Sequence, residues 1–94
     1  MSDDQTKPNV NASKPKVKIF STNWCGFCKM AKAYFESKGI AYEEINIEED
    51  QSAAMWLENQ GLRGVPVIQF DGKDIVHGFD RPQIDIMIRE HNLA

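Results

Sequence analysis

The stretch STNWCGFCKMAKAYFESKG, residues 21–39, decides the fold and the chemistry that this sequence predicts. It holds Cys25 and Cys28, the only two cysteines of the chain, with two residues between them. Behind the first cysteine, apolar side chains recur at the spacing of one helix face, at Phe27, Met30, Ala31, Tyr34 and Phe35. Gly39 is a typical helix end. The stretch therefore predicts a Cys-x-x-Cys pair at the start of a helix over residues 26–38.

Strands and helices alternate around this stretch. The sequence predicts strands at residues 17–20, 41–47, 65–70 and 73–77. Asp50 is the expected N-cap of a helix that ends near Gln60, and Asp80 is the expected N-cap of a last helix. The buried side of the helix after Asp50 is expected to consist of Ala54, Met55, Trp56 and Leu57. Asp-Gly-Lys at 71–73 is a two-residue hairpin signal.

The resulting order, βαβαββα, predicts an α/β fold. The two βα units favour a parallel strand pair, and the hairpin adds antiparallel strands. We expect a four-stranded mixed sheet flanked by three helices, which cover both of its faces. Residues 1–15 are polar and predict a flexible N-terminal tail, so the folded domain is expected to span residues 16–94.

The composition is that of one ordinary globular domain, with 41% hydrophobic and 27% charged residues. The net charge is −3 and the Lys and Arg residues are scattered, so we expect no nucleic-acid partner. The longest apolar run, residues 65–68, is far shorter than the roughly 20 residues of a membrane span, and no secretory signal is recognisable. We expect a cytoplasmic monomer, and in that reducing compartment lone cysteines are more often catalytic or metal-binding than bridged.

The position of the cysteine pair predicts different roles for its two thiols. Unpaired N–H groups and the helix dipole favour negative charge at a helix N-terminus. Cys25 lies at the cap, where its thiolate is stabilised, and Cys28 lies one turn inside, where its sulfur is more shielded. We expect Cys25 to attack a substrate disulfide and Cys28 to resolve the mixed disulfide that forms.

Two other uses of the cysteine pair are weaker. A structural zinc site needs about four ligands, and beyond the two sulfurs the chain offers only His77, His91 and carboxylates, without a second Cys-x-x-Cys motif. A permanent disulfide between Cys25 and Cys28 would close a very small loop and stabilise the fold little. Redox exchange is therefore the favoured use of the pair, and no metal ligands are assigned.

Three motifs resemble a glutaredoxin, a branch of the thioredoxin superfamily. They are WCGFCK at residues 24–29, RGVPVI at 63–68 and HGFD at 77–80, in the family's order and spacing. The resemblance covers about residues 16–93 and implies the thioredoxin-like fold. It also implies a cis peptide bond before Pro66, close to Cys25. There the backbone of Val65 would pair with an extended substrate and align its disulfide for attack.

The resemblance implies a glutathione site that is about half present. Members that use glutathione carry a basic residue three positions before the first cysteine, where this chain has Thr22. The family's Gly-Gly-x-Asp turn keeps one glycine here, as Gly78-Phe79-Asp80, while Arg63 and Asp80 remain as partners for a carboxylate and an amino group. Gly78-Phe79 resembles instead the redoxins that serve ribonucleotide reductase and accept electrons from thioredoxin reductase. Glutathione and thioredoxin reductase both stay open as electron donors.

Two aromatic residues next to the cysteines, Trp24 and Phe27, are expected to contact the substrate. Trp24 resembles the start of thioredoxin's Trp-Cys-Gly, and an exposed aromatic ring there would offer a flat surface to a protein partner. The alternative for Trp24 is a half-buried packing residue.

The hypothesis from sequence is a dithiol–disulfide oxidoreductase that reduces protein disulfides or glutathione mixed disulfides. It needs no tightly bound cofactor, with glutathione as a co-substrate in the second case. The rival is a module that carries zinc or an iron–sulfur cluster through Cys25, because monothiol relatives with the motif Cys-Gly-Phe-Ser share a cluster with glutathione. Cys28 stands in place of that serine and makes dithiol exchange available.

Overall fold

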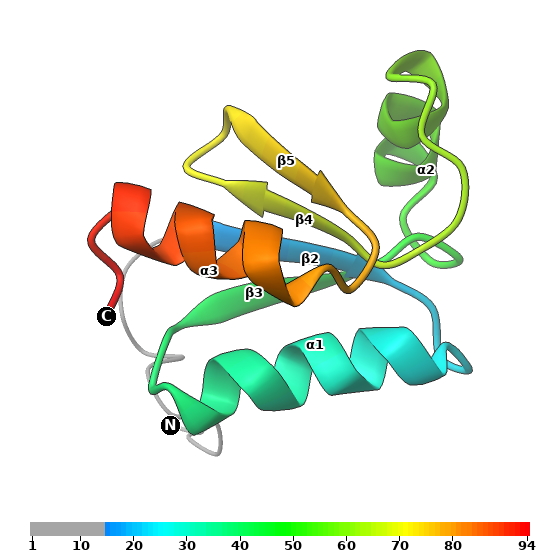
Figure 1. Ribbon diagram of the computed structural model, residues 1–94. Coiled ribbons are helices and arrows are strands. Elements are labelled where there is room, and N and C mark those ends of the chain that lie inside the picture. Colours follow the sequence, from blue (N-terminus) through cyan, green and yellow to red (C-terminus); the bar gives the residue numbers. More distant parts are fainter. Residues whose placement is uncertain (1–14) are drawn as a thin grey trace, which may run out of the picture.

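The computed structural model describes residues 15–94, so the tail predicted over residues 1–15 lies outside the described residues except for Pro15. The predicted order βαβαββα is confirmed (Figure 1). The seven elements are β2 (Val17–Ser21), α1 (Gly26–Ser37), β3 (Tyr42–Asn46), α2 (Gln51–Asn59), β4 (Val67–Phe70), β5 (Asp74–His77) and α3 (Arg81–Glu90). Cys25, Asp50 and Asp80 are the N-caps of the three helices, in chain order.

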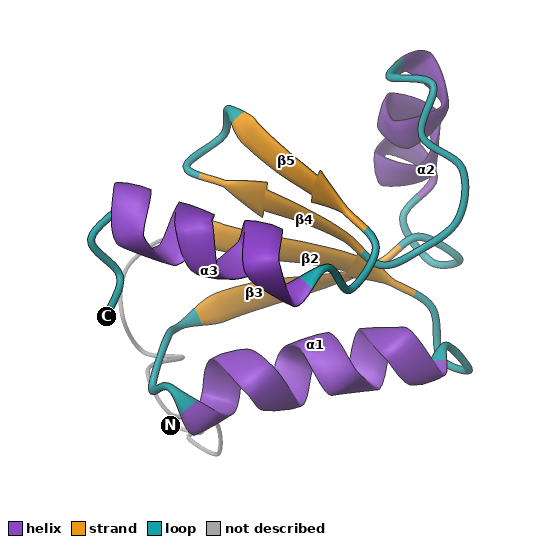
Figure 2. Cartoon of the chain, in the orientation of Figure 1, coloured by secondary structure: helices purple, strands orange, loops and turns teal. Residues whose placement is uncertain are grey.

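The four strands form one mixed sheet in the order β3-β2-β4-β5. Strand β2 pairs in parallel with β3, and the antiparallel hairpin β4–β5 adds to its other side (Figure 2). The first βα unit returns β3 alongside β2, as expected when a helix connects two parallel strands. Strand β2 is therefore central, and it leads directly into the cysteine loop.

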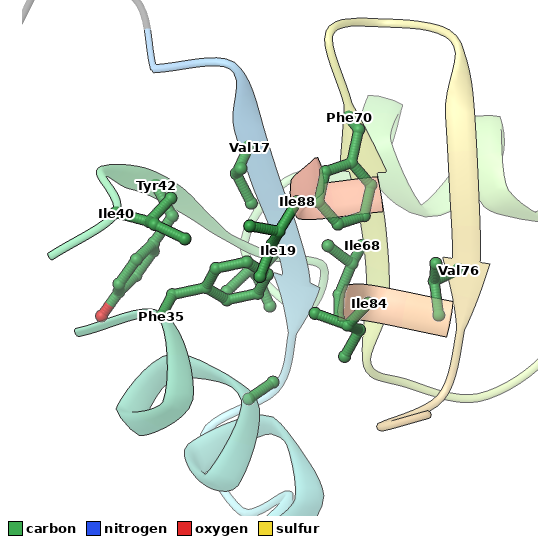
Figure 3. Close-up of a cluster of buried hydrophobic side chains, with 11 residues drawn as sticks. Val17, Ile19, Phe35, Ile40, Tyr42, Ile68, Phe70, Val76, Ile84 and Ile88 are labelled. Carbon is green, nitrogen blue, oxygen red and sulfur yellow. The ribbon is translucent and has the colours of Figure 1, made fainter. Parts of the chain in front are cut away.

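Helices cover both faces of the sheet, as predicted. Successive side chains of a strand point to opposite faces, so Ile19 contacts the core under α1 and α3, while its neighbour Phe20 contacts α2. Phe35 of α1 is fully buried in the first core, where its ring lies 6.1 Å from that of Phe70 (Figure 3). On the other face, Phe20 stacks on Trp56 of α2 with ring centroids 5.3 Å apart.

The buried sides of two helices differ from the sequence prediction. In α1 the buried residues are Cys28, Ala31 and Phe35, whereas Phe27 and Met30 are 62% and 50% exposed. The predicted stripe joined two neighbouring faces, and only one of them meets the sheet. In α2 the buried residues are Ala53 and Leu57, and Ala54 and Trp56 are half-buried. Of the residues predicted for the buried side, only Met55 was wrong, because it is 56% exposed.

Two boundaries of the β4–β5 hairpin also differ from the prediction. Strand β4 begins at Val67, not Val65, because the Val65–Pro66 peptide bond is cis and lies outside the ladder. The register pairs Phe70 with Asp74, so the connection has three residues instead of two. Asp71 and Gly72 both adopt positive φ, which Asp and Gly tolerate better than most residues.

Candidate active site

Cys25 lies in the loop that follows β2, and it caps α1. Figure 1 shows this loop between β2 and α1. Its Sγ accepts a hydrogen bond from the Cys28 N–H at 3.2 Å, which is one of the helix N–H groups without a partner inside the helix. The residue is partly exposed and both cysteines are free thiols. Its sulfur is therefore held at the positive end of the helix dipole and is open to solvent.

Cys28 is in the opposite environment, because its side chain is fully buried on the core side of α1. The pKa of the Cys28 thiol is raised from 9.0 to about 12, mainly by burial and next by a hydrogen bond with the Cys25 side chain. A hydrogen bond with the Thr22 backbone and the charge of Lys32 act in the opposite direction. Cys28 is thus a protonated thiol near neutral pH.

This asymmetry predicts a simple titration. In a Cys25→Ser variant, Cys28 is the only thiol. The effects of the Cys25 thiol on its pKa are then absent, but burial, the largest cause of the raised pKa, is retained, so the ultraviolet absorbance of the thiolate should rise only above pH 9.0. The unfolded chain loses this proton near pH 9.0, so the stability of the folded variant should fall as the pH rises above 9.0. A thiolate signal centred below pH 9.0 in the folded variant would contradict this assignment.

The loop before β4 approaches Cys25 from the other side of the site. The Val65–Pro66 bond is cis, which confirms what the resemblance implied. The Cys25 thiol donates to the Val65 carbonyl, with Sγ and O 3.6 Å apart. The Gly78 N–H donates to the Pro66 carbonyl at 2.8 Å, so the turn after β5 is attached to the same loop. Cys25, Cys28, Val65, Pro66 and Gly78 are therefore brought together.

Large exposed apolar side chains lie next to Cys25 in the sequence and on the first turns of α1. Trp24 is 75% exposed, which favours the exposed alternative over the half-buried one, and its Nε1 donates to Glu48 at 3.0 Å. Phe27 and Met30 lie three residues apart on α1, so their side chains occupy the same side of the helix. We call Trp24, Phe27 and Met30 the apolar rim of the site.

The positions that form the glutathione site in glutathione-using members lie in separate environments here. Thr22 is only 7% exposed, and no hydrogen-bond partner of its Oγ1 is found among residues 15–94. Phe79 is half-buried and packs edge-on against Tyr34 at 6.1 Å, within the core under α1 and α3. Asp80 uses its carboxylate to cap α3 through the Gln83 N–H.

Arg63 lies on the side of this loop that faces α2. Arg63 lines a surface hollow beside α2, together with Leu57 and Leu62. Its carbonyl is 2.6 Å from His77 Nε2, which links the loop to the end of β5. This contact thus attaches the Arg63 backbone to the end of β5, and the residue lies on the α2 side of the site.

One ionic contact near Cys28 was missed from the sequence. Lys32 Nζ lies 2.8 Å from Glu44 Oε2 on β3, and Ser21 Oγ donates to the same oxygen at 2.8 Å. The only local signal was the spacing of four residues between Cys28 and Lys32. The partner on β3 depends on the strand register, which the sequence did not specify.

The part of the chain that the structure covers contains no group of three or more His, Cys, Asp and Glu side chains arranged to hold a metal ion. Within the same residues, no helix has the length and apolar character needed to cross a membrane.

Comparisons with known proteins identify the family. The glutaredoxin family model matches residues 17–75. An uncharacterised glutaredoxin-like 8.6 kDa protein of Clostridium pasteurianum is 37% identical over 75 residues, which cover 79% of this chain and 99% of that protein. The chain belongs to the glutaredoxin family. It is a glutaredoxin-like thiol–disulfide oxidoreductase, and the family needs no tightly bound cofactor.

Solved structures agree with this family and confirm the thioredoxin-like fold. The glutaredoxin-like NrdH-redoxin of Escherichia coli superimposes with a TM-score of 0.67 at 35% identity, over 80% of this chain and 93% of that one. A thioredoxin-like protein, BC3987, has a TM-score of 0.69 at 23% identity over 77% of this chain and 99% of its own, which supports the fold alone. The predicted four-stranded mixed sheet with three helices is the fold of these glutaredoxin-like relatives.

Proposed function

We propose that Cys25 is the nucleophile and Cys28 the resolving thiol in the reduction of protein disulfides. The proposal rests on the contrast between the two sulfurs. Cys25 is partly exposed and accepts a hydrogen bond from a helix N–H, whereas Cys28 is buried and protonated. The thiolate is the reactive form of cysteine, so only the first environment suits attack on an incoming disulfide. Glutathione mixed disulfides are the second candidate substrate.

The reaction proceeds in two exchanges. The Cys25 thiolate attacks one sulfur of the substrate disulfide, and the other sulfur leaves as a thiolate that takes up a proton. Cys28 then loses its proton and attacks Cys25 Sγ, which releases the second substrate thiol and leaves a Cys25–Cys28 disulfide. The substrate gains two electrons and two protons, and the cysteine pair loses them. An external reductant must restore both thiols.

A protein substrate is supported by the surface around Cys25. The apolar rim offers large exposed side chains in the cysteine loop and on the first turns of α1, and aromatic side chains contribute strongly to protein interfaces. The Val65 carbonyl lies next to Cys25 Sγ, so an extended substrate backbone docked along Val65 and Pro66 would have its disulfide beside the nucleophile. Gly78 and Phe79 would border this position from the turn after β5.

We further propose that thioredoxin reductase, rather than glutathione, recharges the pair. Thr22 is buried and uncharged where glutathione-using members have a basic residue. The Asp80 carboxylate already caps α3. The E. coli NrdH-redoxin, which is 35% identical, is described as having a thioredoxin-like activity profile. Loss of a cationic partner weakens recognition of a carboxylate by about 1–3 kcal/mol.

The test offers the oxidised protein either NADPH with thioredoxin reductase, or glutathione with glutathione reductase. We expect reduction by thioredoxin reductase to be faster by about tenfold or more, the effect of about 1.4 kcal/mol. Trp24→Ala should slow this reaction, while Met55→Ala, which removes another exposed apolar side chain on a different helix, should not. Faster reduction by glutathione would overturn the choice of reductant. Stoichiometric iron and sulfide in anaerobically purified protein would instead favour the cluster carrier.

A further inference from the structure

A lysine on the cysteine helix is held in place close to the buried thiol. Lys32 follows Cys28 by four residues on α1, so the two side chains are neighbours on one side of the helix. Its ammonium contacts Glu44 Oε2 at 2.8 Å, and the fully buried Ser21 donates to the same oxygen. The Lys32 side chain is only 23% exposed. These contacts limit the positions that the charge can occupy.

The electrostatic situation of Cys28 changes during the reaction. In the free protein, Cys25 raises the pKa of Cys28 both through its hydrogen bond and through its charge. In the mixed disulfide, Cys25 carries no ionisable thiol, so both of these effects disappear. Burial still opposes ionisation of Cys28, and the Thr22 backbone and the Lys32 charge still favour it.

We propose that Lys32, held by Glu44 and Ser21, is a positioning residue for the resolving step, in which its ammonium stabilises the thiolate that forms on Cys28. In this step Cys28 gives its proton to solvent and its sulfur attacks Cys25 Sγ. The Cys25–Cys28 bond forms, the bond between Cys25 and the substrate breaks, and the substrate thiolate leaves and is protonated. The proposal rests on the roles of Cys25 and Cys28 proposed above.

A purely structural role for the ion pair explains less. Ion pairs between partly exposed side chains contribute about 0–1 kcal/mol to stability, so the ion pair of Lys32 adds little to the packing of α1 against β3. The same charge acts more strongly on a buried sulfur, because the surrounding dielectric is lower there. Lys29, one residue after Cys28, is exposed and has no such contact in the described chain, so it provides a matched control.

The experiment follows the two exchanges separately. Reduced protein in excess reacts with dithiobis(nitrobenzoate), a coloured aromatic disulfide, in a stopped-flow instrument. The first equivalent of coloured thiol reports attack by Cys25, at a rate that depends on concentration. The second reports resolution by Cys28, at a rate that does not. Lys32→Met, Lys32→Arg and Lys29→Met are compared with the unchanged protein over a range of pH.

We expect Lys32→Met to slow the second phase about threefold. A rise of one pKa unit at Cys28 lowers the thiolate fraction tenfold, while the more basic thiolate attacks about threefold faster, and the first phase should change less than about twofold. The midpoint of the pH dependence of the second-phase rate should rise by about one pH unit. Lys32→Arg should restore most of the rate, and Lys29→Met should leave both phases nearly unchanged. Far-ultraviolet circular dichroism checks that each variant is folded.

Two different failures are distinguishable. If both phases occur and Lys32→Met leaves the second unchanged, or if Lys29→Met slows it equally, the role of Lys32 is wrong and the proposed function stands. If the unchanged protein releases no second equivalent, or if Cys25→Ser reacts as fast as the unchanged protein, the proposed roles of the cysteines are wrong.

Discussion

Replacing Cys25 by serine is expected to abolish disulfide reduction, by about a thousandfold or more. A serine hydroxyl does not ionise near neutral pH, and loss of a nucleophile removes the step on which every later step depends. The remaining thiol, Cys28, is buried and protonated, so it cannot replace Cys25. The measurement is the turnover of insulin disulfides with NADPH and thioredoxin reductase.

The control for this variant is a measurement showing that the Cys25→Ser protein is folded. Serine can still cap α1, because its hydroxyl accepts an N–H as the Cys25 sulfur does. The variant should therefore keep the far-ultraviolet circular dichroism and the thermal midpoint of the unchanged protein. Full activity in a folded Cys25→Ser protein would sink the proposed mechanism.

Replacing Cys28 by serine is expected to slow protein-disulfide turnover by about a hundredfold or more, for a different reason. Attack by Cys25 is retained, but release of the substrate then depends on a thiol from solution. An intramolecular thiol has an effective concentration far above that of any added thiol. Without Cys28, the mixed disulfide therefore accumulates and the substrate is released slowly. Turnover should recover in proportion to the concentration of added small thiol.

The first exchange is the control for this second variant. A single-turnover reaction with an aromatic disulfide should release one equivalent of coloured thiol at the rate of the unchanged protein, without the second equivalent. Loss of this first phase would show that Cys28 is needed for attack itself, which the assignment of roles does not allow.

The elements of this fold could be predicted from the sequence because caps, turn residues and apolar periodicity indicate the same element boundaries. Asp50 and Asp80 are strong caps in front of helical patterns, and the Asp-Gly turn separates two apolar runs. The cysteine pair could be placed on the same grounds, since a strand before it and a helix after it fix its position at a helix start.

Burial and partners were harder to predict, because they depend on which elements meet. Phe27 is as apolar as Phe35, yet only Phe35 faces the sheet, and periodicity alone does not separate two adjacent stripes of one helix. The contact between Lys32 and Glu44 joins α1 to β3 through the parallel register. Thr22 is a polar residue in a polar loop, and nothing in the sequence around it predicts that its side chain is buried.

The most direct test is to map the bond that joins the protein to a trapped substrate. Cys25→Ser and Cys28→Ser proteins are each mixed with a disulfide-containing protein, quenched with acid and analysed by mass spectrometry. The proposed mechanism predicts a stable intermolecular disulfide through Cys25 in the Cys28→Ser protein, and almost none in the Cys25→Ser protein. An equal or greater yield of substrate bound to Cys28 would contradict it.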